Sequence, residues 1–264
     1  MSLKTRIKFL LRLLDFDYSS YAASVSFFAL LSLFPFCILL LNFVFLIYKT
    51  DNLNWVISFL NKYFTSYGIE LIQNQIKISF ENYKANIGIL SFIAFTWSSM
   101  NLYSSIEKGL NACYEIKEGR GFLHSKLISL IIVIVLIPSL LIIAQLNIFY
   151  RRVLMHIGIE SSSFSVFFRM IIIFASLLTL HILSYIFFPY KKIRFVSTIP
   201  GTLFSTISWM LLSISFDWYI KNYSAYSKIY GSIATIIIFL IYIYFISTIF
   251  LMGARLNFLY SKEN

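Results

Sequence analysis

The chain has 264 residues, of which 59% are hydrophobic and only 12% are charged. A soluble domain carries about 25% charged residues, and a globular surface needs more polar cover than this chain offers, so the composition excludes an ordinary soluble protein. The net charge of +11 could indicate nucleic-acid binding. We favour basic residues beside membrane spans, which fix topology and contact anionic lipid headgroups.

Six apolar stretches are long enough to cross a bilayer, which requires about 20 residues. They lie at residues 22–48, 85–106, 127–149, 164–188, 195–220 and 231–256. The first is longer than one span needs, and Pro35 is its expected kink. The sequence therefore predicts an all-α, polytopic membrane helical bundle of about six transmembrane helices, with residues 1–264 forming one membrane domain.

Two segments outside these spans have an amphipathic pattern. In residues 1–17, apolar side chains share one helical face and basic ones another, which is typical of a helix lying on the inner membrane surface. In residues 49–84, apolar residues recur at helical intervals and predict short external amphipathic helices. These helices either cap a cavity or pad the rim of the bundle.

Lys and Arg residues determine the expected orientation. An even number of spans places both termini on one side. That side would hold Lys4, Arg6, Lys8, Arg12, Lys108, Lys117, Arg120, Lys126, Lys191, Lys192, Arg194, Arg255 and Lys262. The opposite side would hold fewer basic residues, several of them far from any span. The positive-inside rule therefore predicts cytoplasmic N- and C-termini.

Motifs that carry common chemistry are missing from the sequence. It contains no GxxxxGK[ST] phosphate loop, no CxxC, no HExxH and no GxSxG, and its three histidines fall in different segments. Cys37 lies in an apolar run and Cys113 in a polar connector, so no disulfide framework is expected. We predict no catalytic residue, no metal site and no cofactor.

Polar residues at membrane depth are the remaining candidates for function. His181 is either a proton-linked or substrate-contacting group or a neutral histidine bonded to another helix. Arg169 either snorkels to the interface or contributes to a site, and Asp217 is either a solvated helix-end charge or a partner of Lys221. Asn101 belongs to a group of small and hydroxylated residues that either pack helices together or line a polar cavity.

A stripe of tyrosines separates the last two spans. Tyr219, Tyr223, Tyr226 and Tyr230 follow at intervals of four, three and four residues, the spacing of one helix face. We expect the fifth span to continue as a helix through this stretch and to bury Tyr226 and Tyr230 against the bundle. Gly231 would then permit the tight reversal into the sixth span.

Four motifs in order identify a family resemblance. They are YAASVSFFALLSLFPFCILLL at 21–41, GLNACYEIKEGR at 109–120, FPYKKIRFVSTIPGTLFSTISWMLL at 188–212 and FDWYIKNYSAYSKIYGSIATIIIFLIYIYFISTIFLMGARLN at 216–257. With them the chain resembles the YihY/BrkB family of bacterial membrane proteins over nearly its whole length. The motif positions with an expected structural role are Pro35, Asn111, Pro189, Gly201, Tyr219, Tyr226, Tyr230, Gly231 and Gly253.

The resemblance implies a multi-pass protein of the bacterial cytoplasmic (inner) membrane with about six helices. The family has carried an older label as the ribonuclease BN, and transport of lipid-like molecules has been suggested for some members. This chain departs from the family pattern at Arg255, where an acidic residue usually follows the Gly-Ala pair. Arg255 would instead hold anionic headgroups or a carboxylate from another helix.

Three functions are compatible with the sequence. The favoured one is a transporter or flippase-like exporter of an amphipathic or lipid-linked substrate, with membrane lipids as partners and His181, Asp217, Arg255, Arg169 and Asn101 as candidate cavity residues. The alternative is a non-transporting assembly factor or scaffold, which would form oligomers or bind a partner. A ribonuclease has only the basic charge in its favour.

Overall fold

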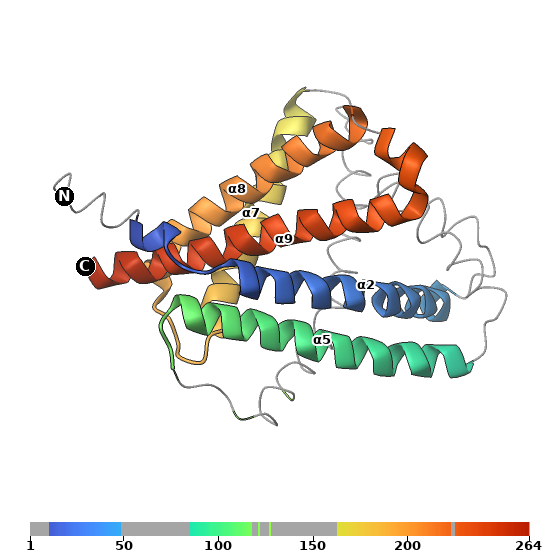
Figure 1. The fold of residues 1–264 in the computed structure, drawn as a ribbon, viewed down its shortest axis with the longest axis horizontal. Coiled ribbons are helices and arrows are strands. Elements are labelled where there is room, and N and C mark those ends of the chain that lie inside the picture. Colours follow the sequence, from blue (N-terminus) through green and yellow to red (C-terminus); the bar gives the residue numbers. More distant parts are fainter. Residues whose placement is uncertain are drawn as a thin grey trace.

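The computed structural model describes residues 11–48, 85–117, 121, 127, 163–222 and 225–263 (Figure 1). Of these, the side chains of residues 37, 40–48, 85–88, 163–169, 221, 225–235 and 263 lie outside the description. The described elements are five helices and no strand: α2 (Ser19–Tyr48), α5 (Ala85–Cys113), α7 (Ser163–Phe187), α8 (Phe195–Asn222) and α9 (Ala225–Glu263). Within the described part of the chain, the expected all-α fold is confirmed.

The described helices are apolar outside and polar inside. The exposed side chains include Ile172, Leu183 and Ile214, whereas the fully buried ones include His181, Thr206 and Asn257. In water this arrangement would be unfavourable, because apolar burial drives folding there. In lipid it is expected, since the tails cover apolar surface while hydroxyl and amide groups bond helices together.

Four of the helices contain a segment long and apolar enough to cross a membrane. These segments are Ser19–Phe36, Met170–Phe187, Phe195–Ile220 and Ile236–Lys262. They confirm a multi-pass membrane protein and coincide with the predicted first, fourth, fifth and sixth spans. Helix α5 covers the predicted second span at 85–106, but its many serines make it more polar than these four segments.

The helices form a row in which neighbours in space differ from neighbours in sequence. Helix α2 lies alongside α5 and also contacts α9, while α8 lies against both α9 and α7 (Figure 1). Ser24 of α2 and Ser105 of α5 share a hydrogen bond of 2.8 Å, and the rings of Phe36 and Phe95 lie 5.4 Å apart. Helices α2 and α9, which are distant in sequence, are neighbours in space.

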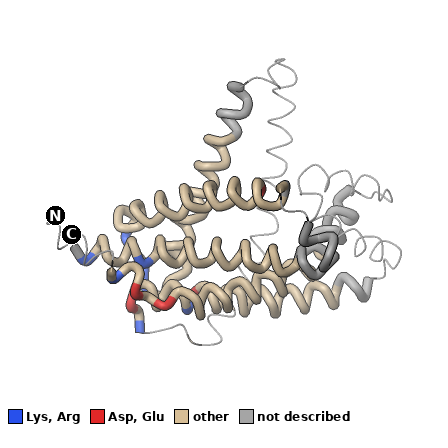
Figure 2. Tube along the Cα trace, turned by 45° about the horizontal axis from the view of Figure 1, so that its top comes forward, with Lys and Arg blue, Asp and Glu red and all other residues tan. Residues whose placement is uncertain are grey.

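Charged residues gather at one end of the bundle, where the described part of the chain begins and ends (Figure 2). The start of α2, the end of α5 and the end of α9 all lie at this end of the bundle (Figure 1). Asp17 accepts hydrogen bonds from the Ser19 amide and from the hydroxyls of Ser19 and Ser20. A carboxylate is favourable at this helix start, and these bonds, led by the Ser19 hydroxyl, hold the Asp17 pKa below its usual value.

The prediction for the tyrosine stripe is wrong in one respect. The fifth helix does continue to Asn222, but a new helix begins at Ala225, so Gly231 lies inside α9. The α8 end is satisfied locally, because the Asn222 Nδ2 donates to the Trp218 carbonyl at 2.8 Å. Tyr219 therefore belongs to α8, and Tyr226 and Tyr230 belong to α9 with side chains outside the description.

Other predictions fall outside the described residues. These are the third span at 127–149, apart from Leu127, the amphipathic helices at 49–84, and residues 1–10 of the interfacial helix. Helices α2 and α8 both continue through their internal prolines, Pro35 and Pro200. The number of six spans and the cytoplasmic placement of the termini thus stay predictions.

Candidate functional site

Helices α8 and α9 touch backbone to backbone at Gly201 and Gly253. A Cβ atom built on Gly201 would collide with the Gly253 carbonyl oxygen, and one built on Gly253 would collide with the Ser205 hydroxyl. Only glycine permits this approach. Asn257, one turn after Gly253, accepts the Gly201 N–H at 2.6 Å with its Oδ1 atom. Gly201 and Gly253 therefore form the joint on which the neighbouring polar side chains are arranged.

Tyr185 of α7 reaches into this joint and ties three helices together. Its hydroxyl lies 2.8 Å from the Ser205 Oγ of α8 and donates to the Phe250 carbonyl of α9 at 2.8 Å. Its ring stacks on that of Phe250 with centroids 4.9 Å apart. Tyr185 is fully buried. Its hydrogen bonds and its ring packing together hold α7 against α8 and α9.

His181 lies one turn before Tyr185, at the same contact of α7, α8 and α9. It is fully buried, and its ring lies edge-on to Trp209 with centroids 4.8 Å apart. The Nδ1 atom is 2.8 Å from the Leu177 carbonyl and 3.2 Å from the Thr206 hydroxyl. The Nε2 atom is buried and has no hydrogen-bond partner among the described residues.

A stripe of hydroxyl groups on α8 leads towards His181. Thr198, Thr202 and Thr206 follow at intervals of one helical turn, Ser205 adjoins them, and all four are buried. At 1.5 Å per residue the stripe extends over about 12 Å of the helix. The Thr202 Oγ1 atom is buried without a partner in the described part of the chain. Apolar helices thus enclose an incompletely bonded polar strip.

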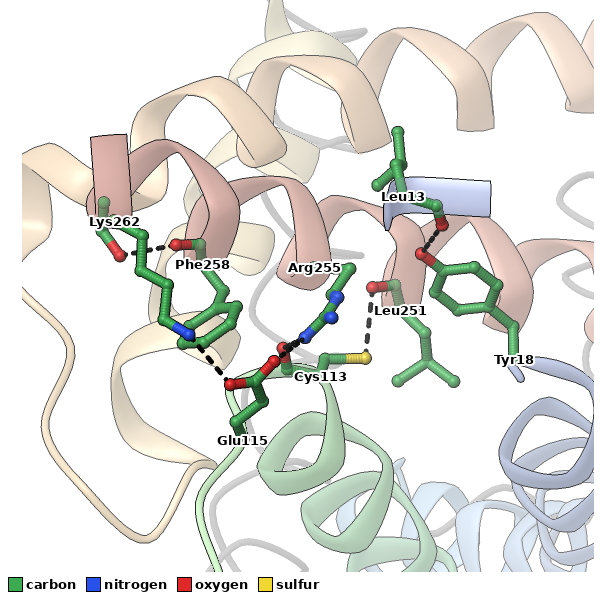
Figure 3. Close-up of polar contacts among 9 residues, drawn as sticks. Leu13, Tyr18, Cys113, Glu115, Leu251, Arg255, Phe258 and Lys262 are labelled. Atoms are coloured by element: carbon green, nitrogen blue, oxygen red, sulfur yellow. Dashed lines mark hydrogen bonds and ion pairs between the residues drawn. The ribbon is translucent and has the colours of Figure 1, made fainter. Parts of the chain in front are cut away.

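Arg255 is the centre of a second polar cluster, at the charged end of the bundle. Its Nη1 donates to the Cys113 carbonyl and to the Glu115 Oε1, both at 3.1 Å, while the Lys262 Nζ pairs with the Glu115 Oε2 at 2.9 Å (Figure 3). The guanidinium also lies over the rings of Phe16 and Phe258, at 5.2 and 5.1 Å from their centroids. Arg255 therefore binds a carboxylate from the turn that follows α5, close to one of the two roles expected for it.

The carboxylate is placed by an unusual helix end. Glu115 has a φ of 54°, and two bonds close the turn, from the Glu115 N–H to the Ala112 carbonyl at 3.1 Å and from the Ile116 N–H to the Asn111 carbonyl at 2.8 Å. Glycine is the usual residue at this left-handed position of the Schellman motif. The ion pairs with Lys262 and then Arg255 offset the backbone strain and hold the Glu115 pKa below its usual range.

Two asparagines link this end to the joint between α8 and α9. The Asn257 Nδ2 donates to the Tyr114 hydroxyl at 3.4 Å, so Asn257 connects α9 with both the end of α5 and Gly201. The Asn111 Oδ1 accepts the Tyr190 N–H at 2.9 Å and ties α5 to the segment that follows α7. Pro189 is fully buried in that segment. The motif residues Asn111, Pro189, Gly201 and Gly253 thus lie at contacts between elements.

The five candidate cavity residues do not form one cluster in the described structure. His181 lies at the contact of α7, α8 and α9, and Arg255 lies at the charged end. Asp217 is exposed on α8, two turns after Trp209 and about 12 Å further along the helix. Asn101 is partly buried on α5, and its carbonyl accepts the Ser105 hydroxyl at 2.9 Å. Arg169 belongs to α7 with its side chain outside the description.

Sequence reasoning missed the partners that complete both clusters. Tyr185, Glu115 and Asn257 each bond across helices that are distant in the chain. The sequence did carry a signal for Asn257, because an amide one turn after Gly253 is a costly polar group in an apolar helix. Glu115 had no comparable signal, since a charged residue in a connector is ordinary. Among the described residues, no three potential metal-ligating side chains lie together.

Comparison with known proteins gives a consistent result. The family described as Virulence factor BrkB matches residues 9–264. The Bacillus subtilis (strain 168) protein named "Putative ribonuclease-like protein YfkH" is 30% identical over 253 residues, which are 92% of this chain and 90% of the relative. A "UPF0761 membrane protein" of Glaesserella parasuis is 27% identical, over 70% of this chain and 66% of its own. No solved structure matches the chain.

Proposed function

Since the chain belongs to the BrkB family, matched over residues 9–264, we propose that this multi-pass membrane protein moves an amphipathic, lipid-like molecule across the bilayer. The observation that carries the proposal is the buried Nε2 atom of His181, which lacks a partner in the described structure. An unsatisfied buried polar group costs about 1–3 kcal/mol. The contacts to Leu177 and Thr206 give the Nδ1 atom a structural role, but they do not account for the Nε2 atom.

The arrangement around His181 supports movement of a molecule with a polar head and an apolar body. The interior of the α7, α8 and α9 contact offers hydroxyls, while its exterior is apolar and faces the lipid tails. Polar residues inside a transmembrane bundle commonly mark substrate or ion pathways. Tails could remain in lipid while a polar head follows the hydroxyl stripe of α8. The substrate class is therefore amphipathic, with the head recognised by hydrogen bonds.

We further propose that the bundle has six spans, with α5 and residues 127–149 as the second and third, in the bacterial inner membrane. Helix α5 packs alongside α2, and many of its exposed side chains are apolar. Both observations favour a position of α5 within the membrane despite its serines. The described basic residues cluster at the end where α9 finishes (Figure 2). By the positive-inside rule that end would face the cytoplasm.

A non-transporting scaffold is the second candidate, and the joint between α8 and α9 favours it. Two glycines and the Asn257 bridge fix these helices closely, as a rigid assembly platform would require. A ribonuclease has less support. The Bacillus subtilis relative bears a ribonuclease-like name, but basic residues at the membrane end explain the charge without RNA.

The test is lipid movement by the purified protein in sealed liposomes. The probe is a fluorescent phosphatidylglycerol whose outer-leaflet fraction is bleached by dithionite. Protein-containing liposomes should lose fluorescence beyond the fraction lost without protein, because inner-leaflet probe reaches the outer surface. Bleaching that matches protein-free liposomes would contradict transport, and a stable stoichiometric partner in a mild-detergent pull-down would then support the scaffold.

A further inference from the structure

We propose that the Nε2 atom of His181 is the site at which this protein takes up a proton, and that uptake favours separation of α7 from α8 and α9. The inference rests on the proposed transport function, because proton uptake at His181 would couple that transport to protons. It rests on geometry for its mechanism, because the ring is held in one tautomer with one free acceptor. Each element of that geometry can be followed from named contacts.

The tautomer follows from the bond to Leu177. A carbonyl oxygen can only accept a hydrogen bond, so the Nδ1 atom, 2.8 Å from the Leu177 oxygen, carries the proton. The Thr206 hydroxyl lies 3.2 Å from the same nitrogen. In a neutral imidazole the other nitrogen is then an acceptor with a lone pair. That nitrogen is Nε2, which is buried with no partner among the described residues.

A proton is the ligand that this acceptor can take without a cavity. The groups facing the ring in the described structure are Tyr185 of its own helix, Thr206 and Trp209 of α8, and Phe250 of α9. Of these, Tyr185 alone is titratable and none is charged at neutral pH. Its hydroxyl is already bonded to Ser205 and Phe250. Of the groups at this contact, His181 is thus the one whose side chain can bind a proton and become charged.

The hydroxyl stripe provides a direction from which protons can arrive. Thr198 lies in the first turn of α8, beside Arg194 at the basic end, and Thr202, Ser205 and Thr206 follow to His181. Hydroxyls both donate and accept hydrogen bonds, so they can pass protons through intervening water when the helices part. The unpartnered Thr202 Oγ1 lies midway along this stripe. The stripe therefore connects the His181 ring, which it meets at the Nδ1 side, with the end of the bundle that carries the charges.

Protonation would change what the closed contact can accommodate. A proton from water binds the Nε2 lone pair, and the neutral imidazole becomes an imidazolium with a second N–H donor. The described neighbours offer this donor no acceptor, and an unpaired charge in an apolar interior is strongly unfavourable. Helices α8 and α9 are locked by Gly201 and Gly253. Helix α7 is therefore the element expected to move so that the imidazolium meets water.

The direct test is nitrogen NMR of histidine-labelled protein in lipid nanodiscs, from about pH 8 to about pH 5. The signal of His181 is identified by its absence in His181→Asn. Asparagine keeps an N–H donor for the Leu177 carbonyl but has no counterpart of Nε2. We expect a neutral Nδ1–H tautomer at high pH, conversion to imidazolium as the pH falls, and faster amide exchange in α7 at low pH after correction for intrinsic rates.

Ser176→Ala, on an exposed face of α7, is the matched control and should titrate as the wild type does. A His181 signal that stays neutral across the range, or that titrates without any change in α7 exchange, would overturn the proposal. Transport is a separate readout. Lipid movement that ignores pH in both wild type and His181→Asn would refute proton coupling and leave transport intact, whereas titration without lipid movement would refute transport and leave the proton site intact.

Discussion

Gly253 is the residue at which the close approach of α8 and α9 depends on a missing side chain. A methyl group there would collide with the Ser205 hydroxyl and lie 2.5 Å from the Tyr185 hydroxyl. Both groups belong to the hydrogen bonds that hold α7 to α8. Because neither can withdraw without breaking that bond, the helices themselves would have to shift.

Gly253→Ala should therefore destabilise the protein by about 2 kcal/mol, within the range for overpacked contacts. The measurement is the thermal or SDS-induced unfolding midpoint in mild detergent. Gly121→Ala is the control, since a Cβ there meets no atom of the described residues within 4 Å. Equal unfolding midpoints for the two variants would contradict the described joint.

Glu115 combines a strained backbone with two ion pairs. Because its folded-state pKa is lowered, its stabilising contribution is complete above the unfolded pKa and is lost as the pH falls through the folded one. Its side chain is 51% exposed, so the ion pairs contribute less than about 1 kcal/mol. Glu115→Gln should lower the unfolding midpoint at neutral pH and match the wild type once the pH has fallen below the lowered folded-state pKa of Glu115.

Glu115→Gly separates the backbone effect from the charge effect. Glycine relieves the left-handed strain that glutamate and alanine both carry there. Glu115→Gly should thus be more stable than Glu115→Ala, by up to about 1 kcal/mol. The reverse order in the same unfolding measurement would show that the φ of Glu115 does not strain the folded chain.

At the scale of elements, hydropathy predicted the helices but not their neighbours. Long, predominantly apolar runs define α2, α7, α8 and α9, because a membrane span needs little more than length and apolar composition. Which helices pack together depends on individual side-chain contacts, such as the hydrogen bond between Ser24 and Ser105 that joins α2 to α5. Serine is common in transmembrane helices, so its partner could not be inferred from one sequence.

The same limit explains the candidate residues. His181 and Arg255 could be selected from the sequence because each is a costly group in an apolar segment. Their surroundings could not, since Glu115 is 140 residues from Arg255 and Trp209 lies on the next helix. The tyrosine periodicity predicted one helix because spacing alone does not reveal where a helix ends, and α8 ends at Asn222 while α9 begins at Ala225.

The contact between α2 and α5 can be tested in native membranes by cross-linking. Ser24→Cys combined with Ser105→Cys should form a disulfide on mild oxidation, because the two hydroxyl oxygens lie 2.8 Å apart and a bridge needs neighbouring Cβ atoms. The linked peptides are identified by mass spectrometry. Ser24→Cys with Ser176→Cys on α7 is the control pair and should stay reduced. A bridge in the control pair but not in the test pair would contradict the arrangement.

At the scale of the whole molecule, the asymmetry of charge predicts the orientation. Lys192 and Lys262 are exposed at the end that carries the termini, and Asn222 is exposed at the far end of α8. Lys192→Cys and Lys262→Cys should react with a membrane-impermeant maleimide only after the cytoplasmic face is opened. Asn222→Cys should react in intact cells. The opposite pattern would reverse the proposed topology.

The described helices are apolar outside, α8 and α9 are in close contact through glycine, and some polar atoms where α7 meets them have no partner among the described residues. Helices α8 and α9 form a tightly packed pair, and α7 is held against them by a few polar bonds. This arrangement suits a protein that opens between α7 and that pair. The buried acceptor of His181 lies at that side. Our central claim is that this contact, and not the bundle in general, performs the movement of amphipathic molecules.

The most direct measurement of that claim is the initial rate at which wild type and His181→Asn move fluorescent phosphatidylglycerol between the leaflets of sealed liposomes. Both proteins must first show the same helical content and unfolding midpoint. We expect the variant to be slower by about tenfold, the factor that corresponds to about 1.4 kcal/mol at the transition state. A variant that moves the probe as fast as the wild type would contradict the claim.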